Sequence, residues 1–339
     1  MRKDVLEKKA YLRSEQALKD IRFAAYKGTD DDGAEKICIL RIASEEIDRV
    51  DIFKPGDFKC GDVYMGRIEN CNENIGVSFA DIGKKEPVFI QGIIKPGTEL
   101  PLCIKTLPYR EKLAKATQKI ASDISEAVMS KAAHAVKGAL LYSAPGAFEK
   151  SIKEACTLPG AKWVTEDKAL YERALSMADD KSRIVLHDDK DLSLCALYGL
   201  SSKLSHVLSG RVDLKSGAEI VISETEAMCV IDVNSARALT GRDKDETFLK
   251  LNLEAAAEIS RQLSARNISG IIMVDFINMR SKESETILLE EFKSLLEALI
   301  PPARLEDITK LGIAEISRKR VGGSISAEKA FLNRTILMK

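Results

Sequence analysis

The feature that most constrains this chain is an alternation of apolar runs and amphipathic segments in its C-terminal third. Residues 228–234 and 270–276 are short and mostly apolar, which is typical of buried strands. Between them, apolar residues recur at three- and four-residue steps over 245–265 and predict a helix, and a further helix is predicted for 282–299. Because a strand–helix–strand crossover places its two strands side by side in the same direction, we predict that these strands are parallel.

Polar residues stand where the two strands end. Asp232 and Asp275 each follow an apolar run, and Asn234 comes two residues after Asp232, so it should point to the same face. The carboxyl edge of a parallel sheet is where ligands bind. Two carboxylates and an amide form an all-oxygen site that suits Mg²⁺. The alternative is that an aspartate at a strand end caps the following helix.

Residues 58–107 show a different sequence pattern. Short alternating runs at 62–68, 75–83 and 87–90 are separated by Gly and Pro, which predicts a small β-barrel. The order G-x-V-Y-x-G-x-I, then D-I-G, V-F-I and K-P-G resembles an S1 domain, an RNA-binding barrel of the OB type. The alternative is another kind of small barrel.

The rest of the chain is less distinctive. We predict charged helices over residues 1–27 and 111–138. The middle third mixes short strands, at 138–142 and 184–187, with amphipathic helices.

Composition excludes several classes of protein. The 52 basic residues balance 52 acidic ones, which argues against nonspecific coating of nucleic acid but allows local basic tracks. No apolar run approaches the roughly 20 residues of a membrane span, and the charged start is unlike a signal peptide. We therefore expect no membrane partner. The seven cysteines include no Cys-x-x-Cys pair, which indicates reduced thiols and a cytoplasmic location. The three histidines are isolated and are read as surface or packing residues.

Longer motifs surround the two aspartates: AMCVIDVNSARA at 227–238, NLEAAAEI at 252–259, GIIMVDFINM at 270–279 and LGIAEISRKR at 311–320. Together with the S1-like segment, this series resembles the ribonuclease E/G family of bacterial endoribonucleases. The resemblance implies an α/β fold in several subdomains, with an S1/OB-type barrel inserted before the ribonuclease H-like and DNase I-like subdomains. The boundaries we expect are 1–57 for the N-terminal part of the ribonuclease H-like subdomain, 58–118 for the barrel, 119–210 for a reduced sensor and ribonuclease H-like region, and 211–339 for the catalytic subdomain.

The resemblance also implies roles for individual residues. The family's metal-binding aspartates match Asp232 and Asp275, and its catalytic asparagine matches Asn234. The implied reaction is Mg²⁺-dependent hydrolysis of single-stranded, AU-rich RNA to 5′-phosphate and 3′-hydroxyl ends, in RNA processing or decay. The S1 aromatics that stack on bases match Phe79 and Phe89, whose alternative role is to fill the barrel core.

Basic residues after the barrel could follow phosphates. Residues 105–119 contain five basic residues and one acidic residue. The alternative is that these basic residues form a solvated helix face and do not contact RNA. Lys112 falls near a lysine of the family's active-site region, and Arg304 matches an arginine there. Both residues are therefore candidate RNA-binding residues.

The sequence departs from the family pattern in three respects. It contains no Cys-Pro-x-Cys pair, so we expect no zinc-linked tetramer, while a homodimer stays an alternative to a monomer. The family's Arg-Thr pair, which grips the RNA 5′ end, has no arginine in the nearest segment, residues 142–146. The chain between the barrel and the catalytic strands is also short.

Two other functions compete with the endoribonuclease. One is a noncatalytic RNA-binding protein that retains the ribonuclease E/G fold, which would have no need for the carboxylates. The other is a different metal-dependent phosphodiesterase that carries an oligonucleotide-binding barrel.

The missing arginine leads to a prediction about 5′-end dependence. Without a bidentate grip on a terminal phosphate, RNAs with 5′-hydroxyl and 5′-monophosphate ends should be cleaved at similar rates. Parallel time courses on two such RNAs of identical sequence test this. A large preference for the monophosphate would contradict it.

Overall fold

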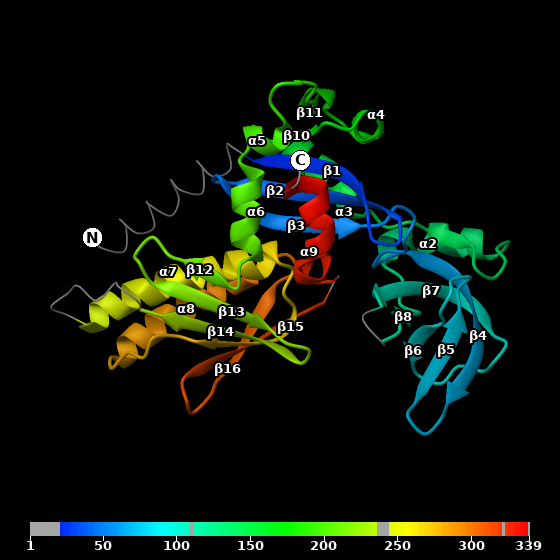
Figure 1. Cartoon of the computed structure of the whole chain (residues 1–339). Coiled ribbons are helices and arrows are strands. Elements are labelled where there is room, and N and C mark those ends of the chain that lie inside the picture. Colours follow the sequence, from blue (N-terminus) through cyan, green and yellow to red (C-terminus); the bar gives the residue numbers. More distant parts are fainter. Residues whose placement is uncertain (1–20, 109–111, 236–243, 321–322, 338–339) are drawn as a thin grey trace. The chain divides into compact units, whose positions relative to one another are not determined.

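The computed structural model describes residues 21–108, 112–235, 244–320 and 323–337. Contacts divide the chain into two compact units (Figure 1). The larger unit comprises residues 1–55, 147–320 and 324–339, and the smaller comprises 56–146 and 321–323.

The first sheet of the larger unit has five strands in the order β11-β10-β1-β2-β3. The strands β1 (Arg22–Thr29), β2 (Glu35–Ala43) and β3 (Glu46–Phe53) are antiparallel. The strands β10 (Lys162–Thr165) and β11 (Ile184–Leu186) extend the sheet in parallel with β1. The smaller unit therefore interrupts the chain of this sheet, as the family resemblance implies.

The helix predicted for residues 1–27 is wrong from Arg22 onward, and residues 1–20 lie outside the described part. Strand β1 is the central strand of its sheet, and its side chains alternate between two cores. Phe23 faces one core and Tyr26 the other. Burial on both faces overrides the helix propensity of the alanines between them.

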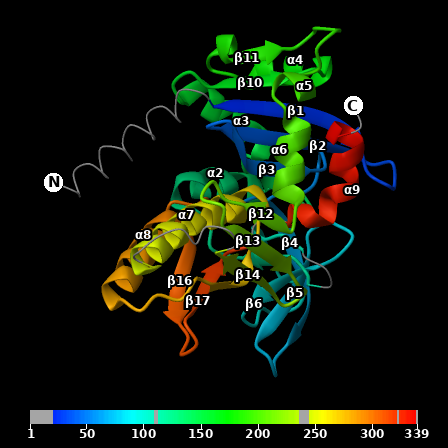
Figure 2. The same ribbon diagram turned by 60° about the vertical axis from the view of Figure 1, so that its left-hand side comes forward.

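Helices cover both faces of this sheet. Phe148 and Ile152 of α3 pack in one core together with Leu170 of α4. Helices α6 and α9 lie together on the other side, as Figure 2 shows. The bounds are α3 Ala147–Thr157, α4 Lys168–Met177, η1 Lys181–Arg183, α5 Leu194–Leu197, α6 Leu200–Leu208, η2 Ile325–Glu328, α9 Lys329–Leu332 and η3 Asn333–Leu337. The mixture of short strands and helices predicted for the middle third is confirmed.

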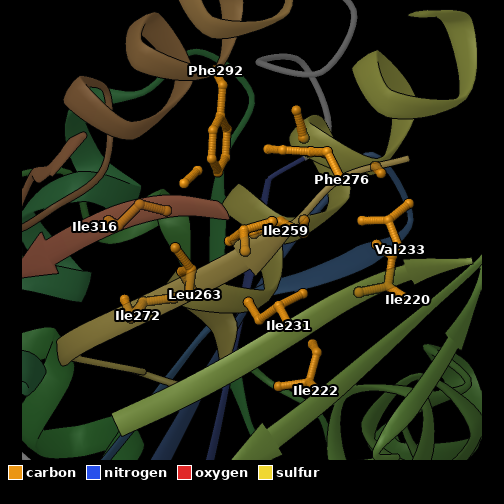
Figure 3. Packing of buried hydrophobic residues seen from close by; sticks show 14 of the residues in the cluster. Ile220, Ile222, Ile231, Val233, Ile259, Leu263, Ile272, Phe276, Phe292 and Ile316 are labelled. Carbon is orange, nitrogen blue, oxygen red and sulfur yellow. The ribbon is translucent and has the colours of Figure 1, made fainter. Parts of the chain in front are cut away.

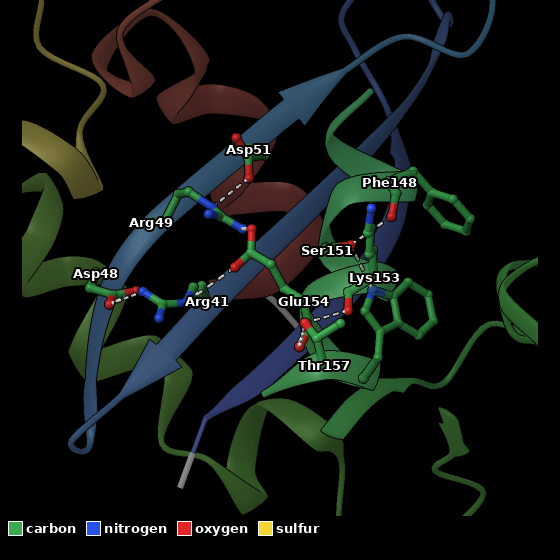
Figure 4. Close-up of polar contacts among 10 residues, drawn as sticks. Arg41, Asp48, Arg49, Asp51, Phe148, Ser151, Lys153, Glu154 and Thr157 are labelled. Carbon is green, nitrogen blue, oxygen red and sulfur yellow. Dashed lines mark hydrogen bonds and ion pairs between the residues drawn. The ribbon is translucent and has the colours of Figure 1, made fainter. Parts of the chain in front are cut away.

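A polar network ties α3 to strands β2 and β3 (Figure 4). The Arg49 guanidinium bonds Glu154 at 2.9 Å and lies 3.0 Å from Asp51. Arg41 pairs with Asp48 at 2.5 Å. Burial raises the pKa of the Asp48 and Asp51 carboxyls against the opposing effect of these arginines. The network thus holds charged side chains in a half-buried position by pairing them.

The second sheet of the larger unit has six strands in the order β12-β13-β14-β15-β17-β16. Its strands β14 and β15 are parallel, as predicted, and the other neighbours are antiparallel. The strands at its two edges and β17 were not predicted. The bounds are β12 Arg211–Asp213, β13 Glu219–Glu224, β14 Met228–Asn234, β15 Gly270–Asp275, β16 Ala303–Ile308 and β17 Ile313–Arg318.

Helices α7 (Lys244–Ala265) and α8 (Lys282–Glu297) cover one face of this sheet. Figure 3 shows Ile231, Ile272 and Ile316 from three strands packed with Ile259 of α7 and Phe292 of α8. Every second residue of each strand enters this core. The residues between them lie on the opposite face, which we call the open face.

The polar side of α7 joins the two sheets of the larger unit. Arg261 donates to the Ile47 carbonyl on β3 at 2.6 Å and pairs with Glu258. One turn further on, the buried Arg266 donates to Gln262 and to the Ser209 carbonyl, which precedes β12. Helix α7 is therefore held by apolar packing against the second sheet and by arginine hydrogen bonds to main-chain carbonyls of the first sheet and of Ser209.

The smaller unit is built on a closed barrel of five strands. The strands pair in the order β4-β5-β6-β8-β7, and β7 pairs back to β4. Only β6 and β8 are parallel within this ring. A closed five-stranded barrel of this kind is an OB-type barrel, so the predicted α/β fold class with an inserted barrel is confirmed. The bounds are β4 Val63–Asn72, β5 Val77–Asp81, β6 Val88–Gln91, β7 Glu99–Thr106 and β8 Lys115–Thr117.

The helix predicted for 111–138 is confirmed only for α2 (Ser122–Ala132). Residues Lys115–Thr117 form β8, whose Ala116 enters the barrel core. This strand closes the barrel by pairing with β7, which precedes it in the chain, and with the earlier strand β6. A short strand, β9 (Leu140–Tyr142), then pairs with the start of β4.

Arg318 is a structural residue at the end of β17. Its side chain is buried, and its guanidinium donates to four main-chain carbonyls, those of Leu263, Ile268, Ile300 and Pro301, at 2.7–3.2 Å. Burial lowers the pKa of Arg318 to about 10, which leaves the group charged at neutral pH. Arg318 therefore supplies hydrogen-bond donors to carbonyls at the end of α7 and in the loop before β16. Its side chain is not available to RNA.

Replacing Arg318 should be destabilising. Arg318→Met leaves several buried carbonyls without donors and should lower the free energy of unfolding by about 2–4 kcal/mol. Arg318→Lys should not restore it, because an ammonium lacks the planar fork. Urea unfolding measures the effect, with Lys319→Met as the exposed neighbouring control. Equal stability of the Arg318→Met and Lys319→Met proteins would contradict this assignment.

No helix in the described part of the chain has the length and apolar character that a membrane span requires.

Candidate active site

Two aspartates face each other across the parallel strand pair. Asp232 of β14 and Asp275, the last residue of β15, are direct partners in the strand register. Their neighbours Ile231 and Val274 enter the core under the helices, so both carboxylates lie on the open face. Adjacent strands are about 4.8 Å apart, which brings two aspartate side chains within reach of one ion.

Asn234 joins this pair, as its spacing predicts. Its side-chain amide donates to Asp232 Oδ2 at 2.8 Å. Asn234 is exposed and Asp232 is half-buried. The hydrogen bond holds one carboxylate oxygen of Asp232 in place and leaves the amide oxygen of Asn234 as an acceptor.

The structure removes the capping alternative for Asp275. Helix α8 is capped by Ser281, whose hydroxyl accepts from the Ser284 amide at 3.3 Å. Asp275 lies six residues earlier and is exposed. Its carboxylate is therefore not engaged in starting that helix.

The donor set fits a hard cation. Among the residues that the structure describes, no lysine or arginine pairs with Asp232 or Asp275. Two unneutralised carboxylates at this spacing repel each other, and a divalent cation would relieve that repulsion. The described residues contain no cluster of three or more His, Cys, Asp or Glu with metal-binding geometry. An ion held here would thus keep much of its water shell, which is typical of Mg²⁺.

The loop after Asp275 is held by two side chains of α7. The fully buried Asn252 bonds both main-chain groups of Ile277, donating to its carbonyl at 2.8 Å and accepting from its amide at 3.0 Å. The Asp245 carboxylate accepts from the Arg280 and Ser281 amides. The helix therefore fixes the backbone that follows Asp275.

Arg304 is not adjacent to the aspartate pair. It is exposed on β16 and pairs with Ser317, which pairs with Ile271 at the start of β15. It thus shares the open face with Asp275 but lies two strands and four residues away, roughly 16 Å by strand geometry.

The two candidate aromatics are neighbours on the barrel. Phe79 of β5 pairs with Phe89 of β6, and their ring centroids are 6.2 Å apart at 69°. Both are half-buried and neither belongs to the barrel core, so neither fills it. The ammonium of Lys115 lies 5.5 Å from the centre of the Phe89 ring.

The basic run over 105–119 follows barrel strands and loops, so its reading as a helix face is wrong. Lys105 is exposed on β7, and Lys115 lies on β8. Lys112 is exposed in the segment between β7 and β8, while Arg110 lies outside the described residues. These lysines and the aromatic pair belong to the smaller unit, whereas the aspartates and Arg304 belong to the larger one.

The segment nearest to the family's 5′-end turn has a structural partner. The Ala144 amide donates to the buried Asp62 carboxylate at 2.7 Å. Lys59 donates to the Ser143 hydroxyl at 3.0 Å. These contacts attach the segment to the start of the barrel.

The fold and the site define a class: an α/β protein that combines an OB-type barrel with paired aspartates at a parallel-strand edge. Comparison with known proteins is specific. The ribonuclease E/G family model matches residues 109–321, and the chain belongs to this family.

Individual relatives match less than half of the chain. Ribonuclease E of Synechocystis is 41% identical over 136 residues, which cover 40% of this chain and 20% of that protein. Ribonuclease E of Escherichia coli is 36% identical over 152 residues, 45% of this chain and 14% of that protein. Ribonuclease G of Haemophilus influenzae is 35% identical over 129 residues, 38% of this chain and 26% of that protein. The matched segments thus span about a quarter or less of each of these relatives.

The anchoring of the loop by Asn252 can be tested directly. Asn252→Ala leaves both main-chain groups of Ile277 without partners and should lower the free energy of unfolding by about 2 kcal/mol. Amide exchange in a peptide covering residues 276–281 should accelerate more than exchange elsewhere. Lys250→Ala, an exposed change on the same helix, is the matched control. Unchanged exchange in the Asn252→Ala protein would rule the anchor out.

Proposed function

We propose that this protein is a Mg²⁺-dependent endoribonuclease that hydrolyses single-stranded, AU-rich RNA in RNA processing or decay. The single observation that supports this most is the register pairing of Asp232 with Asp275 on the open face, with Asn234 bonded to Asp232. A chain that only bound RNA would gain nothing from two carboxylates that no described lysine or arginine neutralises, because they repel phosphate.

Each residue has a role in the proposed chemistry. Asp232 and Asp275 would hold the cation, and Asn234 would fix the Asp232 carboxylate and orient the attacking water. Bound magnesium supplies Lewis-acid stabilisation of the negative charge that develops on the phosphate oxygens. Attack by water with departure of the 3′-oxygen leaves a 5′-phosphate and a 3′-hydroxyl.

The barrel would hold the single strand. Phe79 and Phe89 lie on the second and third barrel strands, the face that OB folds use for oligonucleotides. Stacking on such rings is worth about 1–3 kcal/mol per base and tolerates many sequences. Lys112 would contact phosphates, and Arg304 would do so at a distance from the cleaved bond.

The remaining assignments follow the family. We propose that the two sheets of the larger unit correspond to its ribonuclease H-like and DNase I-like subdomains. Because all seven cysteines are free, we place the protein in a reducing compartment such as the cytoplasm.

Removing either aspartate should separate binding from cleavage. Asp232→Asn and Asp275→Asn should lower the cleavage rate of a short fluorescent AU-rich RNA by roughly a thousandfold or more, since each removes a cation ligand. The affinity for RNA, measured by fluorescence anisotropy, should change little. EDTA should abolish wild-type cleavage and Mg²⁺ should restore it.

The matched control is Asp213→Asn, which removes an exposed carboxylate from the edge strand β12 of the same sheet. Cleavage that survives both site substitutions would refute the assignment of the site. Binding without cleavage by the wild-type protein would favour the noncatalytic RNA-binding alternative.

A further inference from the structure

The turn between β16 and β17 lies directly beside the aspartate pair. Ile313, the first residue of β17, is the register partner of Asp275. Thr309 closes the turn opposite Ile313, with its amide donating to the Ile313 carbonyl at 2.9 Å. Because Thr309 is two strand spacings from Asp275, the turn begins roughly 10 Å from that carboxylate.

The turn is rigid for so short a segment. The Thr309 hydroxyl accepts from the amides of Leu311 and Ile313 at 3.3 and 3.1 Å. The Gly312 amide donates to the Thr309 carbonyl, and Gly312 has a φ of 84°, which favours glycine. A β-carbon there would lie 3.6 Å from the Asn278 side-chain oxygen, so the turn adjoins the loop that follows Asp275.

This rigid turn displays a cation and a large apolar side chain. Lys310 is exposed, and its ammonium has no hydrogen bond or ion pair within the described residues. Leu311 is 80% exposed. Neither side chain stabilises the turn, which Thr309 and Gly312 already define. The charged residues around the turn are Asp275 across the sheet, the register partners Asp307 of β16 and Glu315 of β17, and Arg280 in the adjoining loop.

We infer that Lys310 binds the phosphate next to the scissile one and that Leu311 supports the base or ribose attached to it. This rests on the proposed function. An extended polyanion that approaches two carboxylates needs a cation close by, and the lysine on this turn supplies one without neutralising the pair. An apolar side chain next to it can cover the non-polar face of a nucleotide.

The salt dependence of RNA binding tests the charge contact. Replacing one phosphate-binding lysine should reduce the slope of log affinity against log salt by about 0.7 for a single strand. Lys310→Gln should show this change and raise KM roughly tenfold with a smaller effect on kcat. Lys310→Arg should retain both values. Lys293→Gln, on the helix that covers the opposite face of the sheet, is the matched control and should change neither.

A neutral backbone linkage identifies the phosphate. A methylphosphonate next to the cleaved bond should weaken wild-type binding but have little further effect on Lys310→Gln. Leu311→Ser should raise KM several-fold without altering the salt slope, because it removes only apolar contact.

The outcomes separate this inference from the proposed function. Equal slopes for wild type and Lys310→Gln, or additive losses from the substitution and the methylphosphonate, would overturn the role of Lys310. A wild-type protein that binds RNA without cutting it would overturn the endoribonuclease proposal, while a slope reduced by Lys310→Gln would still support the phosphate contact.

Discussion

The parallel pairing of β14 and β15 is the constraint on which the site depends. Both strands alternate between a core under two helices and an open face, so the register decides which polar residues meet. A shift of one residue would turn Asp275 into the core and bring Val274 opposite Asp232. Because Ile231, Ile272 and their neighbours fill a packed core, such a shift would bury a charge and is strongly disfavoured. Hydrophobic packing on one face thus sets the spacing of carboxylates on the other.

Helix α7 extends this control beyond the sheet. Its apolar side forms part of the core, while Asn252, in its N-terminal half, bonds the main chain of the loop after Asp275. Arg261 in its last turns and Arg266 directly after it bond carbonyls of the other sheet and of the segment before β12. One helix therefore bonds the main chain of the loop after Asp275 and that of the neighbouring sheet. A local change in α7 should be felt at the site through main-chain geometry.

Sequence reasoning succeeded where the signal is local. The strand–helix–strand unit, its parallel strands and the shared face of Asp232 and Asn234 follow from periodicity over short windows. It failed where distant pairing decides. Residues 22–27 and 115–117 are rich in alanine and lysine, yet they become strands because the sheet centre and the barrel closure require them. Asn252 and Thr309 were not singled out, because each acts by bonding main-chain groups that only the fold brings near.

Charge patterns in the sequence are also a weak guide to where RNA phosphates would bind. Residues 318–320 are all basic, but Arg318 donates to four carbonyls inside the fold. The basic run over 105–119 reads as a helix face, but its described lysines lie along barrel strands and loops. Lys310 belongs to no such run and is exposed on the turn next to Asp275. Because phosphate attraction depends on exposure and on the distance to the reacting bond, a single well-placed lysine can matter more than a cluster.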